Sequence, residues 1–595
     1  MTNTQIHNLF FLEVAKGDKL LSNKGKSLSV GDYHIKYIIS ANLPLTLHNT
    51  SNKLVFVLGH PSYHQAINND NFIVQYINNN SKDKYSSIDG EFLIIEIDKS
   101  QSSLKVVNSR FTNPTVFYSS FTDRFVLSTS YFKMIRFLTT NNLAKINSPP
   151  IYELLIFRRL FNNTTYDTSS KHLQPASILR WNKELTITNY WRITYKKNKL
   201  SLHDNAVTLN NLLQKSIQYK TSDNQRYGIM QSGGLDTRLI LTNFTHNAPT
   251  AYTVTYEKNR EYRVAKKLVS YKHGKHVWLQ AKNGQYKDNI DLSSKITGGM
   301  NVADCMFFGD KYDSIIKKDT DILFAGYGMD YFFQGMYLPY KMFKILGEQI
   351  PWYKRIDKIN GNIADYFINN ISYRAKGLSL ESILDKNKLK IMEDWIYNSV
   401  NLQYHDAKKY SDNVFDVWEH MSFGNLSRHY TYGGQLAKME LAEYRTISYT
   451  NELYKLYSSL PIDQRFDARI VRKALKLSDI RSYKLMSANH GYPAGYSSFQ
   501  RSIAHITKRW PERIGIKEKD STFERTWIDR ETILRNEMHN RILQLKKSEV
   551  IEYLDIFNMD DFGNFINKWG NGSAVGNQTL MAIITIESFF KQVLE

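Results

Sequence analysis

Residues 227–240, "YGIMQSGGLDTRLI", join an apolar run to a helical pattern through a Ser-Gly-Gly turn, with Asp236 two residues further on. Glycines in such a turn let backbone N–H groups approach a ligand closely, and the start of a helix adds partial positive charge. The negative charge of Asp236 would repel a phosphate group unless Asp236 holds a magnesium ion that bridges phosphate oxygens. The stretch therefore predicts a loop that binds a polyphosphate together with Mg²⁺.

Strand and helix patterns alternate on both sides of this loop. Apolar runs such as "PTAYTVTY" (249–256) and "HVWLQ" (276–280) alternate with helical patterns such as "NREYRVAKKLVSYKHG" (259–274). This alternation predicts an α/β fold with a doubly wound parallel sheet, whose ligands bind at the C-terminal ends of the strands. From about residue 335 the pattern is mainly helical.

The first 195 residues have a different rhythm. Short apolar or alternating runs, such as "KLVFVLGH" (53–60), "EFLIIEID" (91–98) and "RFVLSTS" (124–130), are bounded by turn residues. A chain of 595 residues is too long for one ordinary domain. We therefore expect a β-rich layered domain over residues 1–195 and an α/β domain over residues 200–595.

Composition excludes several classes of protein. The net charge of +21 is spread along the chain without a block of five or six like charges, which favours a solvated surface over a nucleic-acid partner. The single cysteine, Cys305, rules out a disulfide framework and a cysteine-rich metal site. No signal-peptide pattern is present, and the apolar run at 580–590 is too short to span a membrane. We expect a cytoplasmic protein without a membrane partner.

A second glycine-rich loop, "FAGYGMDYFFQG" (324–335), follows a later strand and carries Asp330. Two such loops can grip one pyrophosphate through a shared cation, with Asp236 and Asp330 as its ligands. The "GKS" at 25–27 does not fit a Walker A loop, because no glycine lies five positions before Gly25. The "HGKH" at 273–276 lacks further ligands at zinc spacing.

The loop "SGGLDTR" resembles the pyrophosphate loop of the ATP-pyrophosphatase enzymes, and the wider layout resembles the asparagine synthetase family. That family includes β-lactam synthetases and lasso-peptide cyclases. The residues around "SIDGEFLIIEID" (87–98) resemble its glutaminase-type, Ntn-hydrolase-like αββα domain. Residues 252–278, with Glu261 and Ala265, and residues 440–461, with a Glu-x-Arg, resemble later segments of its synthetase domain.

The resemblance implies a reaction and a set of site residues. A substrate carboxylate, on a small molecule or a peptide, attacks the α-phosphorus of ATP and releases pyrophosphate. Ammonia or an amine then displaces AMP from the acyl-adenylate and forms an amide, with Mg²⁺ held by Asp236 and Asp330. The resemblance assigns ATP binding to Met230 and Val254 at the adenine and to Ser232, Gly233, Gly234, Asp236, Thr237 and Gly326 at the phosphates.

Two departures concern the nitrogen source. Members that hydrolyse glutamine begin with Met-Cys, whereas position 2 here is Thr2, and "VLGHPSYH" (57–64) stands where their Asn-Gly-Glu segment is expected. We therefore expect no glutaminase activity, so that ammonia or a substrate amine is the nucleophile. The alternative is that Thr2 serves as an N-terminal nucleophile.

A further departure concerns proton transfer. Tyr327 stands where asparagine synthetases carry Glu, and this resembles the β-lactam synthetase branch, in which a Tyr–Glu pair deprotonates the amine. Glu443 is the candidate partner of Tyr327; alternatively Tyr327 packs and Glu443 bonds Arg445. Tyr331 replaces the usual Glu after Asp330.

Two basic positions complete the candidate site. The family's late lysine, which stabilises charge near the adenylate, is assigned to Lys484, with Lys473 as the alternative. Arg238, in place of the usual Ser, is expected to contact phosphate or to pair with an acid.

The sequence thus predicts an ATP-dependent amide-forming ligase of the asparagine synthetase type. Two rivals stay open: a tRNA-modifying ATP pyrophosphatase that uses the same loop, and an inactive scaffold, which the altered loops suggest. The sequence does not name the acid or the amine, and it leaves a homodimer open.

Overall fold

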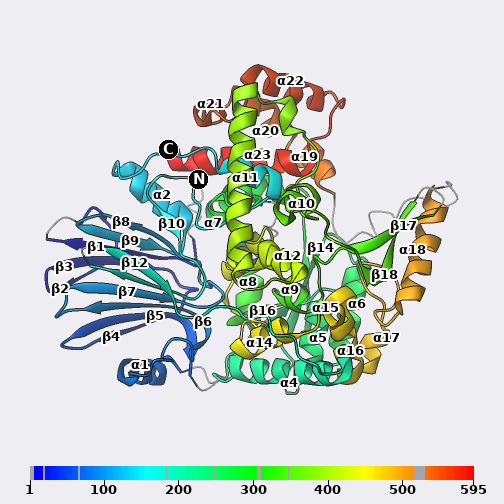
Figure 1. Cartoon of the computed structure of the whole chain (residues 1–595), viewed down its shortest axis with the longest axis horizontal. Coiled ribbons are helices and arrows are strands. Elements are labelled where there is room, and N and C mark those ends of the chain that lie inside the picture. The colour runs from blue at the N-terminus through cyan, green and yellow to red at the C-terminus, as the bar shows by residue number, and fades with distance from the viewer. Residues whose placement is uncertain are drawn as a thin grey trace.

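The computed structural model describes residues 6–17, 20–63, 68–182, 184–246, 248–303, 310–345, 348–513 and 529–595. Thr2 and Cys305, which the sequence singles out, lie outside the described residues. Figure 1 shows two lobes side by side: a β-sandwich formed by the N-terminal part of the chain, on the left, and a larger lobe of helices around a parallel sheet.

Two six-stranded antiparallel sheets form the first lobe in the described residues. One has the order β10-β8-β9-β1-β3-β2 and the other the order β12-β11-β7-β6-β5-β4. The elements of residues 1–195 are β1 (Phe10–Lys16), β2 (Lys26–Val30), β3 (Tyr33–Ile39), β4 (Leu45–Asn49), β5 (Lys53–Ser62), α1 (Asn69–Asn78), β6 (Asp89–Asp98), β7 (Ser103–Asn108), β8 (Phe117–Ser120), β9 (Arg124–Ser128), α2 (Tyr131–Thr140), α3 (Ile151–Phe157), β10 (Lys171–His172), β11 (Ser177–Trp181) and β12 (Leu185–Asn189). Of these, α3 packs against helices of the larger lobe.

Alternation along the strands explains why these sheets stack, since successive side chains point to opposite faces. Phe10 of β1 and Phe56 of β5 meet in the core between the two sheets, where their rings lie 6.0 Å apart. On the outer faces, Val55 of β5 packs with α1, and Phe11 of β1 lies 5.2 Å from the Phe137 ring of α2. Helix, sheet, sheet and helix form successive layers, so the predicted β-rich αββα architecture is confirmed.

A five-stranded parallel sheet, in the order β15-β14-β13-β16-β19, lies at the centre of the larger lobe. The chain builds β14 and β15 on one side of β13 and then β16 and β19 on the other. The predicted doubly wound sheet is confirmed, and its strand order reverses beside β13, where such sheets bind ligands. The elements are α4 (Leu202–Lys220), β13 (Tyr227–Met230), α5 (Leu235–Asn243), β14 (Thr250–Thr255), α6 (Arg260–Ser270), β15 (His276–Gln280), α7 (Gln285–Thr297), α8 (Asp310–Asp319), β16 (Ile322–Ala325), α9 (Met329–Phe333) and β19 (Glu443–Thr446).

Helices dominate the remainder, as predicted from residue 335 onward, with a β-hairpin and β19 as the exceptions. None of the helices in the described ranges has the length and apolar character needed to cross a membrane. The elements are β17 (Tyr340–Ile345), β18 (Glu348–Ile356), α10 (Ile363–Asn370), α11 (Lys386–Lys408), α12 (Val414–Phe423), α13 (Tyr432–Met439), α14 (Asn451–Ser459), α15 (Ile462–Arg465), α16 (Arg469–Ser478), α17 (Ile480–Lys484), α18 (Ser498–Arg513), α19 (Arg530–Glu537), α20 (His539–Gln544), α21 (Glu549–Leu554), α22 (Met559–Gly570) and α23 (Asn577–Leu594).

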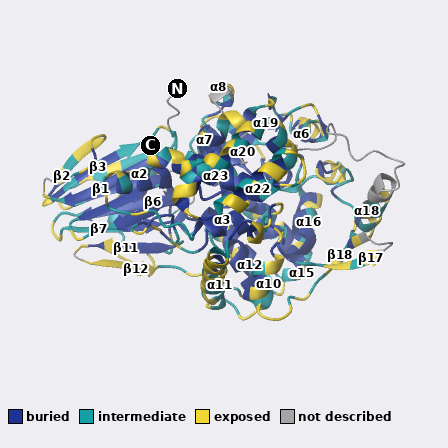
Figure 2. Cartoon of the chain, turned by 90° about the horizontal axis from the view of Figure 1, so that it is seen from above, coloured by how far each residue is buried: buried dark blue, intermediate teal, exposed yellow. Residues whose placement is uncertain are grey.

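Buried contacts join the two lobes, and Figure 2 shows buried residues continuing from the sandwich into the larger lobe. The C-terminal helix α23 packs against α7 and also against α2 and α3. Glu91 of β6 accepts hydrogen bonds from Lys220 Nζ and from the Thr446 N–H, both at 2.9 Å. Arg159, just after α3, donates to two carbonyl oxygens at the end of α12, each at 2.7 Å. Removing one partner of such a buried contact is costly, so these contacts fix the lobes relative to each other.

Candidate active site

The Ser-Gly-Gly turn lies between β13 and α5, at the C-terminal end of the central strand. Thr237 organises the turn, because its Oγ1 accepts the Ser232 N–H at 3.2 Å and the Gln231 Nε2 at 3.1 Å. The Gly234 N–H in turn donates to Ser232 Oγ at 3.2 Å. Gly233 must be glycine, since a Cβ there would lie 2.4 Å from the Cβ of a neighbouring alanine. The turn is therefore ordered by its own polar groups.

Arg238, one turn into α5, holds this loop from behind. Its side chain is fully buried, and its guanidinium donates four hydrogen bonds of 2.8–3.0 Å to backbone carbonyls of Gly233, Ser482, Leu485 and Met486. Burial lowers the pKa of Arg238 to about 10. The expectation that Arg238 contacts phosphate or pairs with an acid is wrong, because carbonyl dipoles from a distant segment take up its donors.

The second glycine-rich loop joins β16 to α9 and touches the first loop. A Cβ on Gly326 would lie 2.7 Å from the Asp236 Cβ and 3.1 Å from Thr237 Cγ2, so this approach requires glycine. Gln334, at the end of α9, donates a hydrogen bond from Nε2 to Asp236 Oδ1. Asp330 lies in the first turn of α9. The two loops thus meet at adjoining strand ends.

A cavity of about 660 Å³ lies over these strand ends, a volume within the usual range for ligand sites. Asp236 and Asp330 both line it, so the structure brings the two predicted metal ligands to one site. Gly233 and Gly234 are not among the lining residues. The other predicted residues that line the cavity are Met230, Ser232, Thr237, Val254, Gly326 and Tyr327.

The surroundings of the two aspartates disfavour their charged forms. Burial raises the pKa of Asp236 to about 7. Burial and the nearby charge of Asp236 raise the pKa of Asp330 well above its usual range. A bound cation would offset both effects, because it neutralises carboxylates that desolvation and mutual repulsion disfavour.

These residues fit a magnesium ion that arrives with a nucleotide. Mg²⁺ is commonly held by one or two carboxylates together with substrate phosphates and water, rather than by a cage of protein ligands. Within the ranges described, no three His, Cys, Asp or Glu side chains are grouped closely enough to hold a metal. Phosphate oxygens would have to complete the coordination of an ion between Asp236 and Asp330.

Glu261, in the first turn of α6, is a third acid of the cavity. Its pKa is raised to about 7 by burial, although a hydrogen bond with the Gly233 backbone opposes the shift. Its Oε2 is buried and makes no hydrogen bond with the residues that the structure describes. The family resemblance placed Glu261 in the strand–helix unit after the loop but assigned it no role at the site.

The predicted Tyr327–Glu443 pair is not formed. Tyr327 lines the cavity and donates from its hydroxyl to the Leu426 carbonyl at 2.9 Å. Glu443 is the first residue of β19 and therefore lies at the opposite end of the parallel sheet from the cavity. There it accepts from Arg445 Nε at 3.0 Å and pairs with His60 Nε2 at 2.8 Å. The structure shows the alternative arrangement, in which Glu443 bonds Arg445.

Neither predicted lysine reaches the cavity. Lys484 ends α17 with an exposed side chain, and Lys473 is half-buried in α16. Neither is among the residues that line the site. The cations that do line it are Arg158, Lys438 and Arg530. None of these three cations was predicted from the sequence, because they lie far from both glycine-rich loops along the chain.

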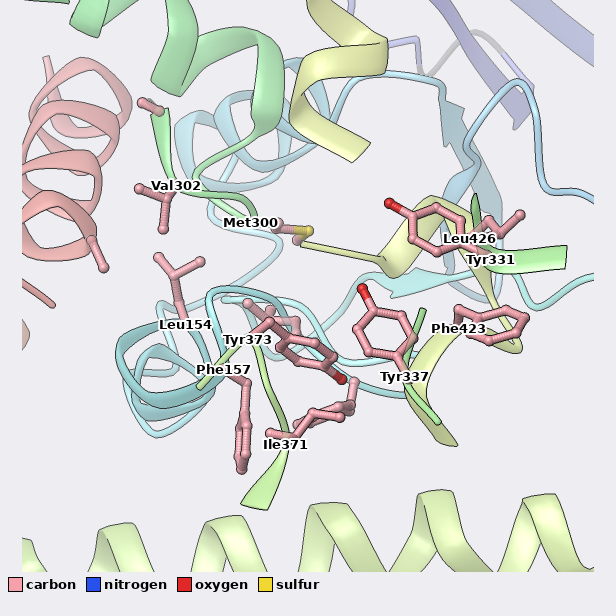
Figure 3. Packing of buried hydrophobic residues seen from close by; sticks show 14 of the residues in the cluster. Leu154, Phe157, Met300, Val302, Tyr331, Tyr337, Ile371, Tyr373, Phe423 and Leu426 are labelled. Carbon is pink, nitrogen blue, oxygen red and sulfur yellow. The ribbon is translucent and has the colours of Figure 1, made fainter. Parts of the chain in front are cut away.

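Tyr331, another departure from the family pattern, heads a buried chain of hydrogen bonds. Its hydroxyl lies 2.5 Å from Thr431 Oγ1, which lies 2.9 Å from His429 Nδ1, and His429 Nε2 lies 2.6 Å from the Tyr337 hydroxyl. Burial lowers the pKa of His429 well below its usual value, so the ring stays neutral at pH 7. Figure 3 shows Tyr331 and Tyr337 beside Phe423, whose ring stacks on Tyr331. This packing fixes the Tyr331 hydroxyl at the cavity wall.

Comparison with known proteins identifies the family of the larger lobe. The asparagine synthase family model matches residues 208–475, from α4 to α16, a stretch that contains the parallel sheet and both glycine-rich loops. The chain therefore carries an asparagine synthase domain, which confirms the resemblance to the asparagine synthetase family. That family consists of ATP-dependent ligases that form amides.

Other comparisons are more distant. No curated protein matches the chain. The structure of the allosteric regulatory enzyme of purine biosynthesis shares 8% identity over 38% of this chain and 54% of its own, with a TM-score of 0.21. The glutamine phosphoribosylpyrophosphate amidotransferase from B. subtilis, solved with ADP and GMP, shares 8% identity over 46% of this chain and 60% of its own, with a TM-score of 0.19. The chain thus spans less than two thirds of either protein, and such partial likenesses do not define its function.

Proposed function

We propose that this protein is an ATP-dependent ligase that activates a carboxylate as its adenylate, releases pyrophosphate and forms an amide. The observation that carries the proposal is the meeting of Asp236 and Asp330 at one cavity, over the ends of β13 and β16. Asp236 and Asp330 would hold Mg²⁺, which supplies charge neutralisation at the phosphates when it is bound. The asparagine synthase domain of residues 208–475 supports the same reaction class.

The residues of this chain have separate tasks in that reaction. Ser232 and Thr237, at the helix start, would bind phosphate oxygens through N–H and hydroxyl donors. Met230 and Val254, on neighbouring strands of the cavity wall, would pack against the adenine. The Tyr331 hydroxyl, held by Thr431, would orient the incoming nucleophile at the cavity wall.

We further propose that ammonia or an amine on the substrate is the nitrogen donor, without glutamine hydrolysis by this chain. The segment "VLGHPSYH", in place of an Asn-Gly-Glu, supports this, because most of it forms the end of β5. Its His60 is buried and bonded to Glu443 of the other lobe, so it contributes to the interface between lobes.

The test is pyrophosphate release from ATP and Mg²⁺ in the presence of a panel of mono- and dicarboxylic acids, with ammonium or glutamine as the nitrogen source. The proposal expects release that depends on one of the acids and product formation with ammonium or with no added nitrogen. Asp236→Asn should abolish release, whereas Asp321→Asn, in a surface ion pair with Arg226, should not. Release that persists in Asp236→Asn would refute the site, and glutamate formed from glutamine would refute the nitrogen assignment.

A further inference from the structure

The described chain before residue 208 contributes one residue to the cavity wall, an arginine. Arg158, directly after α3, lines the cavity, although only 6% of its surface is exposed. Arg530, the first residue of α19, lines the same cavity. Both arginines lie outside residues 208–475, the stretch that matches the asparagine synthase family. The family match therefore gives neither of them a role.

Arg158 lies at a strained position of the backbone. It is the C-cap of α3 and has a left-handed conformation, with φ 61° and ψ 18°. Glycine or asparagine usually occupies such a position, because other residues pay about 1 kcal/mol or more of strain there. The next residue, Arg159, is anchored to two carbonyl oxygens at the end of α12. This anchor fixes the path of the chain where Arg158 enters the cavity.

Both arginines line the cavity together with Tyr430. The guanidinium carbon of Arg158 lies 4.7 Å from the centre of the Tyr430 ring. Burial raises the pKa of Tyr430, whereas the charges of Arg158 and Arg530 both lower it. The charge of Asp330 raises it, so this wall is within electrostatic range of the aspartate pair. The cavity thus combines acids at the two loops with a pair of guanidinium groups near Tyr430.

We propose that Arg158 and Arg530 form an oxyanion-binding site at the Tyr430 wall of the cavity, which the N-terminal part of the chain completes through the residue that follows α3. A guanidinium group is planar and matches the paired oxygens of a carboxylate or a phosphate. The oxyanion comes either from a second carboxylate of the acid substrate or from a nucleotide phosphate. The inference rests on the proposed function in taking the cavity as the substrate site. It gives the N-terminal part of the chain a role in substrate binding that does not require glutamine hydrolysis.

The experiment uses the full chain with Mg²⁺ and separates the two sources. Calorimetry measures the affinity for α,β-methylene-ATP, and thermal unfolding measures how much more succinate, a dicarboxylate, stabilises the protein than propionate, a monocarboxylate. The variants are Arg158→Gln, Arg158→Lys and Arg530→Gln, which changes a different element. Arg180→Gln, on an exposed position of β11, is the matched control in the first lobe.

A phosphate source predicts that Arg158→Gln and Arg530→Gln weaken nucleotide binding at least about tenfold, with partial recovery in Arg158→Lys. A carboxylate source predicts unchanged nucleotide affinity and loss of the extra stabilisation by succinate. The proposal is overturned if Arg158→Gln equals the wild type in both measurements, or if Arg180→Gln has the same effect. A wild-type chain that binds no nucleotide would count against the proposed ligase, while the succinate measurement without nucleotide would still test the arginine site.

Discussion

Gly326 lies directly against Asp236, and this contact joins the two glycine-rich loops. A Cβ on Gly326 would be 2.7 Å from the Asp236 Cβ and 3.2 Å from the Thr237 backbone nitrogen. Real Cβ atoms do not approach other atoms this closely, so any larger residue must push the loops apart.

Gly326→Ala should therefore lower the rate of pyrophosphate release by about tenfold or more, because small misplacements of catalytic groups have large effects on rate. Gly563→Ala, in α22, is the control, since a Cβ there meets only one atom, at 3.9 Å. That variant should keep its activity and gain a few tenths of a kcal/mol to about 1 kcal/mol in stability. Equal activity in Gly326→Ala and the wild type would show that the loops do not need their close contact.

Arg238 should matter for stability rather than for phosphate binding. Arg238→Met removes four hydrogen bonds of a buried guanidinium, so we expect a loss of about 3 kcal/mol or more and a lower thermal unfolding temperature. Arg180→Met, on the exposed face of β11, should change stability by about 0.5 kcal/mol or less. Equal unfolding temperatures in Arg238→Met and Arg180→Met would contradict a stabilising role for the hydrogen bonds of Arg238.

Stability of the ligand-free protein should fall as the pH rises from about 4 to about 7. The pKa of Asp236 rises from an ordinary value of 3.8 to about 7 in the folded chain, so folding favours its protonated form, and that advantage disappears once the pH exceeds the folded pKa. Asp236→Asn should flatten this part of the stability profile, measured as the unfolding temperature against pH. Other buried acids contribute a background, so the comparison with Asp236→Asn isolates this group. Identical slopes for the two proteins would argue against the raised pKa.

The variant Glu443→Gln tests whether Glu443 acts as a base together with Tyr327, as the sequence predicted, or has only a structural role. Glu443 lies at the far end of the sheet, bonded to Arg445 and His60, so we expect a lower unfolding temperature with a rate of amide formation within about threefold of the wild type. Loss of a true general base would cost roughly 10²–10⁴-fold. A fall of that size with an unchanged unfolding temperature would restore Glu443 to the reaction.

The two glycine-rich loops could be predicted from the sequence because the residues that identify each loop lie close together along the chain. Gly233, Asp236 and Asp330 each follow an apolar strand, and strand ends in a parallel sheet meet at one edge. Glu443 was not placed correctly because the pattern from about residue 335 predicted helices, so the sequence did not reveal β19 or the position of Glu443 at its start.

Long-range contacts account for the other errors and omissions. The four carbonyls that hold Arg238 include three that lie more than 240 residues away along the chain. Arg158 comes from the N-terminal part of the chain, and only the tertiary contacts of α3 bring it to the cavity. No periodicity or motif in the sequence carries this information.

Measuring cation binding between Asp236 and Asp330 is the most direct test of the proposed metal site. With Mn²⁺ in place of Mg²⁺, electron paramagnetic resonance measures how much metal the protein binds with and without α,β-methylene-ATP. We expect tight binding only with nucleotide, a large loss in Asp236→Asn and in Asp330→Asn, and little further loss in the double variant, because both groups hold one ion. Wild-type binding in either single variant, with Asp321→Asn as the surface control, would contradict a shared cation at this cavity.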